Sequence, residues 1–133
     1  MQTNTFKRDK LWGVHDFRID VFKIALFTQE KTSDEEFYTS VGEVSAEGYT
    51  EGGLALTTLK NGEVEDGVAI VSFADVEWPD STITATHAMV YNSSKADRAI
   101  CVLDLGGEIT SSSEKFTIKF PPGTPNEAFH RET

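Results

Sequence analysis

The sequence of 133 residues is poor in features that mark several protein classes. It holds a single cysteine, Cys101, so it can form neither an intramolecular disulfide nor a site built from several cysteines. No apolar run approaches the roughly 18 residues of a membrane span, and "MQTNTFKRDK" lacks the apolar core of a signal peptide. We therefore expect a soluble chain that is made in a cytoplasm and has no membrane partner.

Basic residues are also scarce. The chain has 12 Lys and Arg against 22 Asp and Glu, which gives a formal net charge of −10. Binding to a nucleic acid relies on clustered Lys and Arg that release counterions from the phosphates, so we expect no nucleic-acid partner. An acidic surface still permits docking on a basic patch of another protein.

The length predicts one domain over residues 1–133, and a chain of this size buries roughly 68% of its extended surface. The stretch "TNTFKRDKLWG" predicts one or two helical turns within residues 1–13, with Thr5 as N-cap and Gly13 as the stop. The prolines of "PPGTPNEAFHRET" keep residues 121–133 out of a central strand, so we expect a C-terminal tail there.

Between these ends the hydrophobic period is two or mixed, which is typical of strands. Turns are predicted at Asn61-Gly62, Asp66-Gly67 and Trp78-Pro79-Asp80. The predicted strands lie near residues 19–28, 41–47, 54–60, 68–75, 81–92, 98–105 and 114–120. About seven to eight short strands without a long helix predict an all-β fold: an antiparallel, jelly-roll-like β-sandwich with a short N-terminal helix.

The residues predict neither an enzyme nor a cofactor site. His15-Asp16 resembles half of a catalytic dyad, but Cys101 is predicted on an apolar strand, whereas a reactive thiolate needs an electropositive, accessible setting. The oxygens of Asn61, Glu63, Glu65 and Asp66 do not match the spacing of a calcium loop. We interpret that stretch as a solvated hairpin tip and expect no metal.

The stretch "ITATHAMVYNSSKADRAICVLDLGGE", residues 83–108, predicts a hairpin with both faces apolar. If residues 93–97 form the loop, Asn92 faces Arg98 and Met89 faces Cys101, and His87 falls on the core face. The reverse face then presents Ala88, Val90, Ile100 and Val102 without an obvious cover. This face could be covered by a segment of this chain or by another protein. A register shift of one residue would exchange the two faces of the hairpin.

The sequence resembles a family of small virion structural proteins of tailed bacteriophages, of the head decoration or cement type. The resemblance spans nearly the whole chain and rests on the order of its glycines, its aromatic residues and an N-S-S turn. The segments that carry it are "TFKRDKLWGVHDFRIDVFKIALFTQE", "YTSVGEVSAEGYTEGGLALTT", "VSFADVEWPDSTITATHAMVYNSS", "RAICVLDLGG" and "FTIKFPPG". The ending "NEAFHRET" departs from the apolar ending of the family.

The resemblance implies a protein that is made in the host bacterial cytoplasm and binds the capsid surface of the virion. Its partners would be the major capsid protein and further copies of itself, as a homotrimer. A protein that binds only the assembled shell stabilises that shell by mass action. We expect the contacts to involve the uncovered hairpin face, with the N-terminal segment as a second contact. The candidate interface residues are Ala88, Val90, Ile100, Val102, Phe6, Leu11 and Trp12.

Two other kinds of function stay open. The first is a fibre or appendage module on the head, neck or tail that binds a receptor or glycan through aromatic side chains near loops. The candidates are Trp12, Trp78, Tyr38 and Tyr49. The second is a small-molecule-binding barrel, which requires a closed sheet around a cavity.

Overall fold

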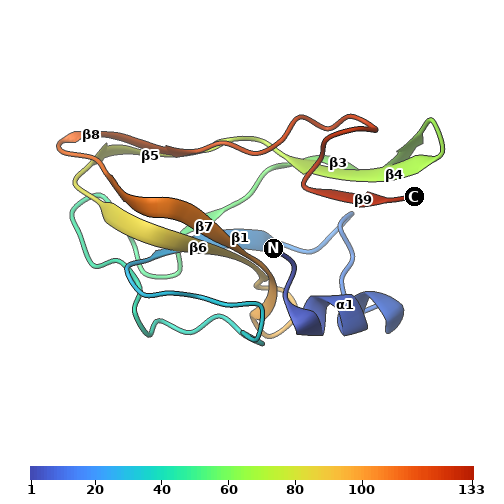
Figure 1. The fold of residues 1–133 in the computed structure, drawn as a ribbon, viewed down its shortest axis with the longest axis horizontal. Helices are drawn as coiled ribbons and strands as arrows, with labels where there is room; N and C mark the ends of the chain where they lie inside the picture. Colours follow the sequence, from blue (N-terminus) through green and yellow to red (C-terminus); the bar gives the residue numbers. More distant parts are fainter.

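The computed structural model describes all 133 residues and contains one helix and nine strands (Figure 1). In chain order the elements are α1 (Asn4–Leu11), β1 (Phe22–Phe27), β2 (Leu54–Ala55), β3 (Thr58–Glu65), β4 (Val68–Phe73), β5 (Val76–Ser81), β6 (Thr84–Asn92), β7 (Arg98–Thr110), β8 (Glu114–Ile118) and β9 (His130–Glu132). All strand pairs are antiparallel. The predicted fold class, all-β with a short N-terminal helix, is confirmed. No helix has the length and apolar character needed to span a membrane.

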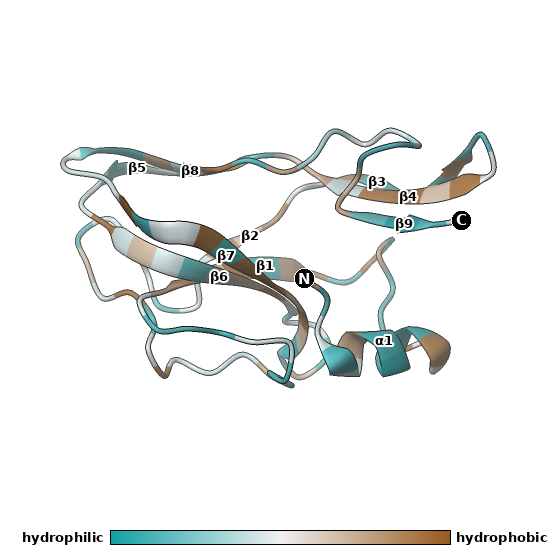
Figure 2. Ribbon diagram, in the orientation of Figure 1, coloured by the Kyte–Doolittle hydropathy of each residue, from teal (hydrophilic) through white to brown (hydrophobic).

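The strands form two layers that face each other across a hydrophobic core (Figure 1). One layer is a four-stranded sheet in the order β2-β1-β6-β7, and the other consists of the sheets β3-β4-β9 and β5-β8. The larger of two core clusters holds 17 buried residues from both layers. Among them are Ile24, Leu26, Ala88 and Val90 from the first layer and Phe73, Val76, Trp78 and Phe116 from the second. Figure 2 shows strongly hydrophobic stretches along β4 and part of β7.

The short helix α1 begins at a hydroxyl cap and ends before a glycine. The Phe6 amide donates to Thr3 Oγ1 at 3.2 Å, so the N-cap is Thr3 rather than the predicted Thr5. Gly13 follows the helix with a φ of 67°, a conformation that glycine adopts without strain. Phe6 is 1% exposed and belongs to the larger core, so the helix is anchored from its first turn.

Two of the predicted turns differ from the structure. Asp66 and Gly67 both have positive φ and join β3 to β4, as predicted. Asn61-Gly62 lies inside β3, where the pairing with β4 shifts register. Trp78-Pro79-Asp80 lies inside β5, which bulges between Trp78 and Ser81. The predicted strand at 41–47 is a loop with a single bridge from Glu43 to Phe27.

The predicted C-terminal tail is partly structured. Its last residues form β9, which pairs with β4 through His130 and Val71. The prolines precede this strand, so they do not interrupt its pairing. The tail therefore completes the second layer.

The hairpin β6–β7 has the predicted five-residue loop but a different register. Asn92 pairs with Arg98 as expected, whereas Met89 pairs with Val102 instead of Cys101. The shift follows Tyr91, where β7 bulges and gains one residue relative to β6. The one-residue slip moves side chains to the opposite face of the sheet.

Both faces of this hairpin are buried within the chain, so of the two covers that the sequence left open, the structure shows the chain itself. The four hairpin residues are therefore not available as an interface. Ala88, Val90 and Ile100 are fully buried in the larger core. Val102, 3% exposed, lies in a second core cluster on the other face of the sheet. That second cluster consists of Ala25, Phe27, Met89, Tyr91, Ala99 and Val102.

The segment 29–40 supplies the cover of the second cluster. The Tyr38 ring stacks on the Tyr91 ring with centroids 4.5 Å apart. The Ala99 amide donates to the Glu36 carbonyl at 2.9 Å, and the Tyr38 amide donates to the Asp97 carbonyl at 2.8 Å. The segment 29–40 is therefore packed against the first layer.

Candidate functional site

The N-terminal helix divides the remaining candidate interface residues into buried and exposed ones. Phe6 packs between the layers and is not available to a partner. Leu11 is 88% exposed and Trp12 is 65% exposed at the other end of the helix. A large apolar side chain that stays in water in the folded monomer is a candidate for contact with another molecule. The helix end is thus the only part of the predicted interface that a partner can reach.

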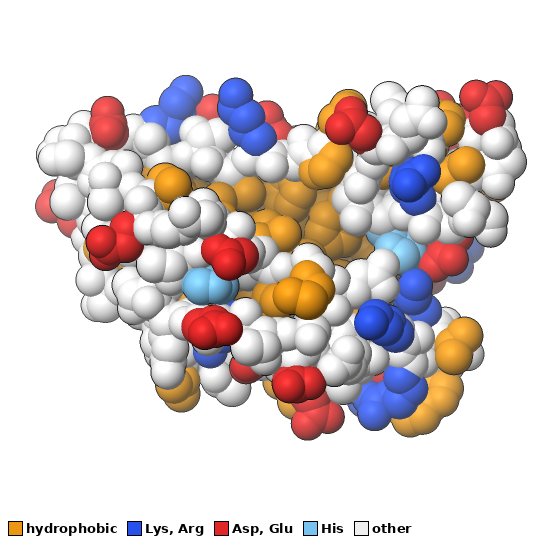
Figure 3. Space-filling view, viewed as in Figure 1, with side chains coloured by type: hydrophobic (Ala, Val, Ile, Leu, Met, Phe, Trp, Pro, Cys, Tyr) orange, Lys and Arg blue, Asp and Glu red, His pale blue; other side chains and the backbone are white.

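Cations surround these two apolar side chains. Lys7 and Arg8 are exposed on the same helix, and the Arg8 guanidinium lies 4.4 Å from the centroid of the Trp12 ring. We name Lys7, Arg8, Leu11 and Trp12 the α1 patch. Figure 3 shows Lys and Arg side chains beside hydrophobic ones at the corner of the molecule where α1 lies.

A buried polar cluster holds the helix against the first layer. Asp9, on the inner side of α1, is fully buried and accepts hydrogen bonds from Arg98 Nη1 at 3.1 Å and from Arg8 Nη2 at 3.1 Å. Asp20 accepts from Lys95 Nζ at 2.9 Å. The Asp9–Arg98 pair joins α1 to the start of β7. The Asp20–Lys95 pair joins the segment before β1 to the loop between β6 and β7. The α1 patch is therefore displayed on a fixed support.

His15 completes the buried polar cluster. Asn92 Nδ2 donates to His15 Nδ1 at 2.9 Å and to Asp20 Oδ2 at 2.8 Å. Because Nδ1 accepts, the ring proton sits on Nε2, which lies 3.6 Å from Asp9 Oδ2. Burial lowers the pKa of His15, although the nearby carboxylates of Asp9 and Asp20 act in the opposite direction. The neutral ring is thus the form that this site accommodates.

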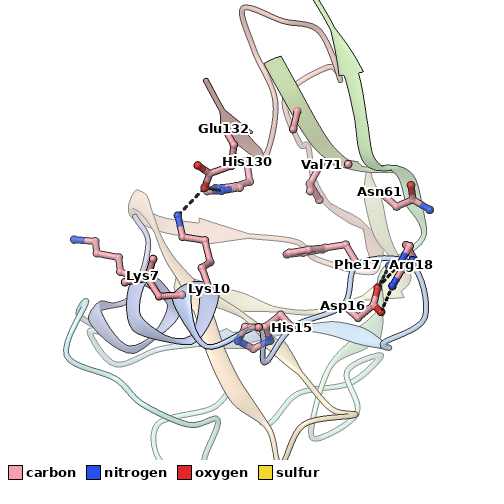
Figure 4. Close-up of a pocket in the computed structure, with 14 residues that line it drawn as sticks. Lys7, Lys10, His15, Asp16, Phe17, Arg18, Asn61, Val71, His130 and Glu132 are labelled. Atoms are coloured by element: carbon pink, nitrogen blue, oxygen red, sulfur yellow. Dashed lines mark hydrogen bonds and ion pairs between the residues drawn. The ribbon is translucent and has the colours of Figure 1, made fainter. Parts of the chain in front are cut away.

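A cleft of about 790 Å³ lies between α1, the segment after it and the sheet β3-β4-β9 (Figure 4). Apart from Lys7, the Lys, Arg, Asp and Glu side chains around it form ion pairs. Lys10 Nζ donates to Glu132 Oε1 at 2.9 Å, and Arg18 Nη2 donates to Asp16 Oδ2 at 2.9 Å. His130 Nε2 also contacts Glu132, at 2.7 Å. The cleft therefore holds paired charges and one unpaired ammonium group, with no unpaired carboxylate and no nucleophile.

The remaining candidates for chemistry are not brought together. Asp16 pairs with Arg18, so the dyad suggested by His15-Asp16 does not form. Cys101 is buried, and burial raises the pKa of its thiol to about 12. His87 is partly exposed and contacts only the Thr86 hydroxyl by its ring nitrogen. The described residues include no group of three or more His, Cys, Asp and Glu side chains placed to hold a metal ion.

Of the four aromatic residues considered for glycan binding, Trp12 alone is largely exposed. Trp78 is 2% exposed in the larger core. Tyr38 and Tyr49 both donate their hydroxyl groups to the Glu43 carboxylate, which also accepts from the Gly52 amide at 2.8 Å. Burial, followed by these hydrogen bonds, raises the pKa of both tyrosines. The pair therefore serves to fix the loop over the first layer.

The buried polar cluster was not predicted from the sequence. Its members come from α1, the segment before β1, the end of β6 and the start of β7, and no local motif links them. A spacing rule finds residues that share one element, whereas these meet only in the folded chain. Searches against protein-family models, curated proteins and solved structures found no match to the chain.

Proposed function

We propose that this chain is a virion structural protein of a tailed bacteriophage and acts as a decoration or cement protein on the assembled head. It has no enzymatic role and binds neither nucleic acid nor membrane. It is made in the bacterial cytoplasm, associates as a homotrimer and contacts the major capsid protein on the capsid surface. The resemblance of its segments to phage head proteins supports this role.

The observation that carries the proposal is the α1 patch. A fixed helix end presents Leu11 and Trp12 to solvent with two cations beside them. Aromatic residues and arginine are enriched in protein interfaces. An aromatic ring buries a large area with little loss of side-chain entropy, and a planar guanidinium donates several hydrogen bonds in a fixed geometry. The patch is suited to a contact between proteins in a shell and not to a reaction.

Binding to expanded capsids of the phage that encodes the chain tests the proposal. We expect the purified protein to sediment with expanded capsids and to raise the temperature at which they disrupt. The double substitution Leu11→Ser and Trp12→Ser should reduce binding at least about tenfold, which corresponds to 1.4 kcal/mol. Leu59→Ser with Val64→Ser is the matched control, since both are exposed apolar residues of β3. Absence of binding, together with absence from purified virions, would refute the proposal.

A second candidate is a fibre or appendage module of the head, neck or tail that binds a receptor glycan. The observation in its favour is the exposed ring of Trp12, since sugars stack on such rings. A glycan array separates the two functions. A signal that disappears in Trp12→Ala but persists in Val64→Ser would favour the appendage, and an array without signal would leave the cement protein.

A further inference from the structure

We propose that the α1 patch of one copy docks on an acidic segment of a second copy of this chain. The acidic segment consists of Asp34, Glu35, Glu36 and Phe37, in the stretch that covers the first layer. The inference rests on the proposed self-association and identifies the surfaces that make it. It concerns contact between copies: in the oligomer the α1 patch meets the neighbouring copy, so substitution of Leu11 and Trp12 weakens capsid binding through loss of the oligomer.

The α1 patch is an exception in the charge distribution of the chain. Three of the 12 basic residues fall within residues 7–10, although the net charge of the chain is −10. The one acidic residue in that range, Asp9, is buried and paired with Arg8 and Arg98. Lys7 has no acidic partner within its own chain. The cations of this helix end are therefore complementary to an acidic surface, which their own chain does not place beside them.

The acidic segment has the opposite character and also exposes an apolar side chain. Asp34, Glu36 and Phe37 are exposed, and Phe37 is 45% exposed. Backbone hydrogen bonds from Ala99 and Tyr38 hold the segment on the edge of β7, so it is presented in a fixed conformation. The Phe37 ring and the carboxylates of the acidic segment complement the Trp12 ring and the cations of the α1 patch.

Leu11 and Trp12 of the α1 patch lie at the opposite end of the helix from the acidic segment. Asn4, at the start of α1, donates through Nδ2 to Asp34 Oδ1 at 2.9 Å, and the Asn4 amide donates to the Ser33 carbonyl at 2.8 Å. Leu11 ends the helix, which is about 12 Å long at 1.5 Å per residue, whereas Lys7 lies one turn after Asn4. Every copy therefore carries both halves of a complementary contact, with the apolar pair of the patch at the far end of α1.

This separation favours a second copy as the occupant. Leu11 and Trp12 cannot meet Phe37 of the same molecule, because α1 is fixed by the buried polar cluster and the acidic segment by the edge of β7. Lys7 is nearer to the acidic segment but makes no ion pair with it. Contact between unlike surfaces of successive copies is head-to-tail and closes into a ring when the rotation allows it. The proposed homotrimer is one such ring.

Light scattering of the purified chain at low ionic strength tests the contact. We expect a mass above that of the monomer and a shift toward monomer as salt rises, because salt screens charges at an interface rim. Lys7→Glu and Glu36→Lys, each alone, should weaken association at least about tenfold, since each sets like charges against each other. Neither side chain makes a hydrogen bond or ion pair within its own chain, so both variants should fold.

Mixing the two variants is the decisive measurement. In a mixture, the unchanged acidic segment of Lys7→Glu meets the unchanged α1 patch of Glu36→Lys. The two substituted side chains also carry opposite charges, so they attract each other where they meet. Association should therefore recover at least in part. Lys119→Glu and Glu108→Lys, which make the same charge changes outside both surfaces, should associate like the parent chain and gain nothing on mixing.

A parent chain that stays monomeric at every salt concentration would overturn the inference. So would an oligomer that neither charge reversal weakens. Capsid binding is scored separately with the parent chain: binding as a monomer would overturn the docking and keep the cement role, whereas a mixed-variant oligomer without capsid binding would do the reverse.

Discussion

His15 is buried in a site that accommodates its neutral ring. The charged groups facing it are Asp9 and Asp20, which favour the protonated ring, and Lys95 and Arg98, which oppose it. Desolvation outweighs the carboxylates and lowers the pKa of His15 below 6.5, the ordinary value for the side chain. The folded chain therefore binds a proton at this ring less readily than the unfolded chain does.

The free energy of unfolding should consequently fall as the pH drops below about 6.5, because the unfolded state takes up the proton first. Urea denaturation at pH 7.5 and at pH 5.5 checks this. The loss should be smaller in His15→Gln, which cannot take up this proton. An equal loss in both proteins would show that other groups cause it.

The thiol of Cys101 is the second residue with a chemical consequence. Burial raises its pKa to about 12, so almost no thiolate forms at neutral pH. We expect a thiol reagent to leave the native chain unmodified for as long as it stays folded and to modify it at once in denaturant. Rapid labelling of the native chain would mean that β7 opens frequently.

At the scale of elements, strands could be predicted where the pattern is local, and registers could not. The turn at Asp66-Gly67 follows from residues that tolerate positive φ, and the loop at 93–97 follows from a polar stretch between two apolar runs. The bulge of β7 at Ile100 has no such signal, because both faces of this strand are apolar and the pattern fits either register. The same two-sided burial made Val90 look exposed.

β5 shows a second reason why some elements could not be predicted from the sequence. Its Trp78-Pro79-Asp80 has the composition of a turn, yet the paired strand accommodates it as a bulge with Asp80 at positive φ. The candidate site, too, could be predicted from the sequence only in part. The exposed end of α1 could be identified from the sequence, whereas the buried polar cluster, with Asp9 of α1, Asn92 of β6 and Arg98 of β7, could not.

Gly53 gives a prediction at this scale. It has a φ of +78°, and a Cβ there would lie 1.7 Å from the Ile24 carbonyl oxygen of β1. Gly67 has nearly the same φ, +77°, with nothing within 4 Å. Gly67→Ala should cost about 1 kcal/mol from backbone strain, and Gly53→Ala about 4 kcal/mol because β1 and β2 must also separate. Urea denaturation of both variants measures the difference, and equal losses would contradict the close approach.

At the scale of the whole molecule, Phe6 links the helix to both layers. Its ring lies 5.6 Å from the His130 ring of β9 and 5.4 Å from the His15 ring of the buried polar cluster. The helix is thus joined to the first layer by ion pairs, and to the second by these aromatic contacts and the Lys10–Glu132 ion pair. The cleft in Figure 4 exists because these two attachments hold α1 and β9 at a fixed spacing.

Phe6→Ala should therefore cost about 3–5 kcal/mol of unfolding free energy, the range for loss of a buried phenylalanine. Leu11→Ala, on the same helix, should change stability by less than about 0.5 kcal/mol. Thermal and urea denaturation of the two variants provide the test. A small loss in Phe6→Ala would indicate that the helix is attached by the ion pairs alone.

The pairing of the first residues with β7 also has a consequence for how the chain acquires its structure. The Thr3 amide donates to the Ile100 carbonyl, and Met1 and Val102, which exchange hydrogen bonds, are 101 positions apart. β9 likewise pairs with β4, which lies far earlier in the chain. During synthesis residues 1–3 have no strand partner until β7 has left the ribosome. Closing such distant pairings costs a large loss of chain entropy, so folding should be slow.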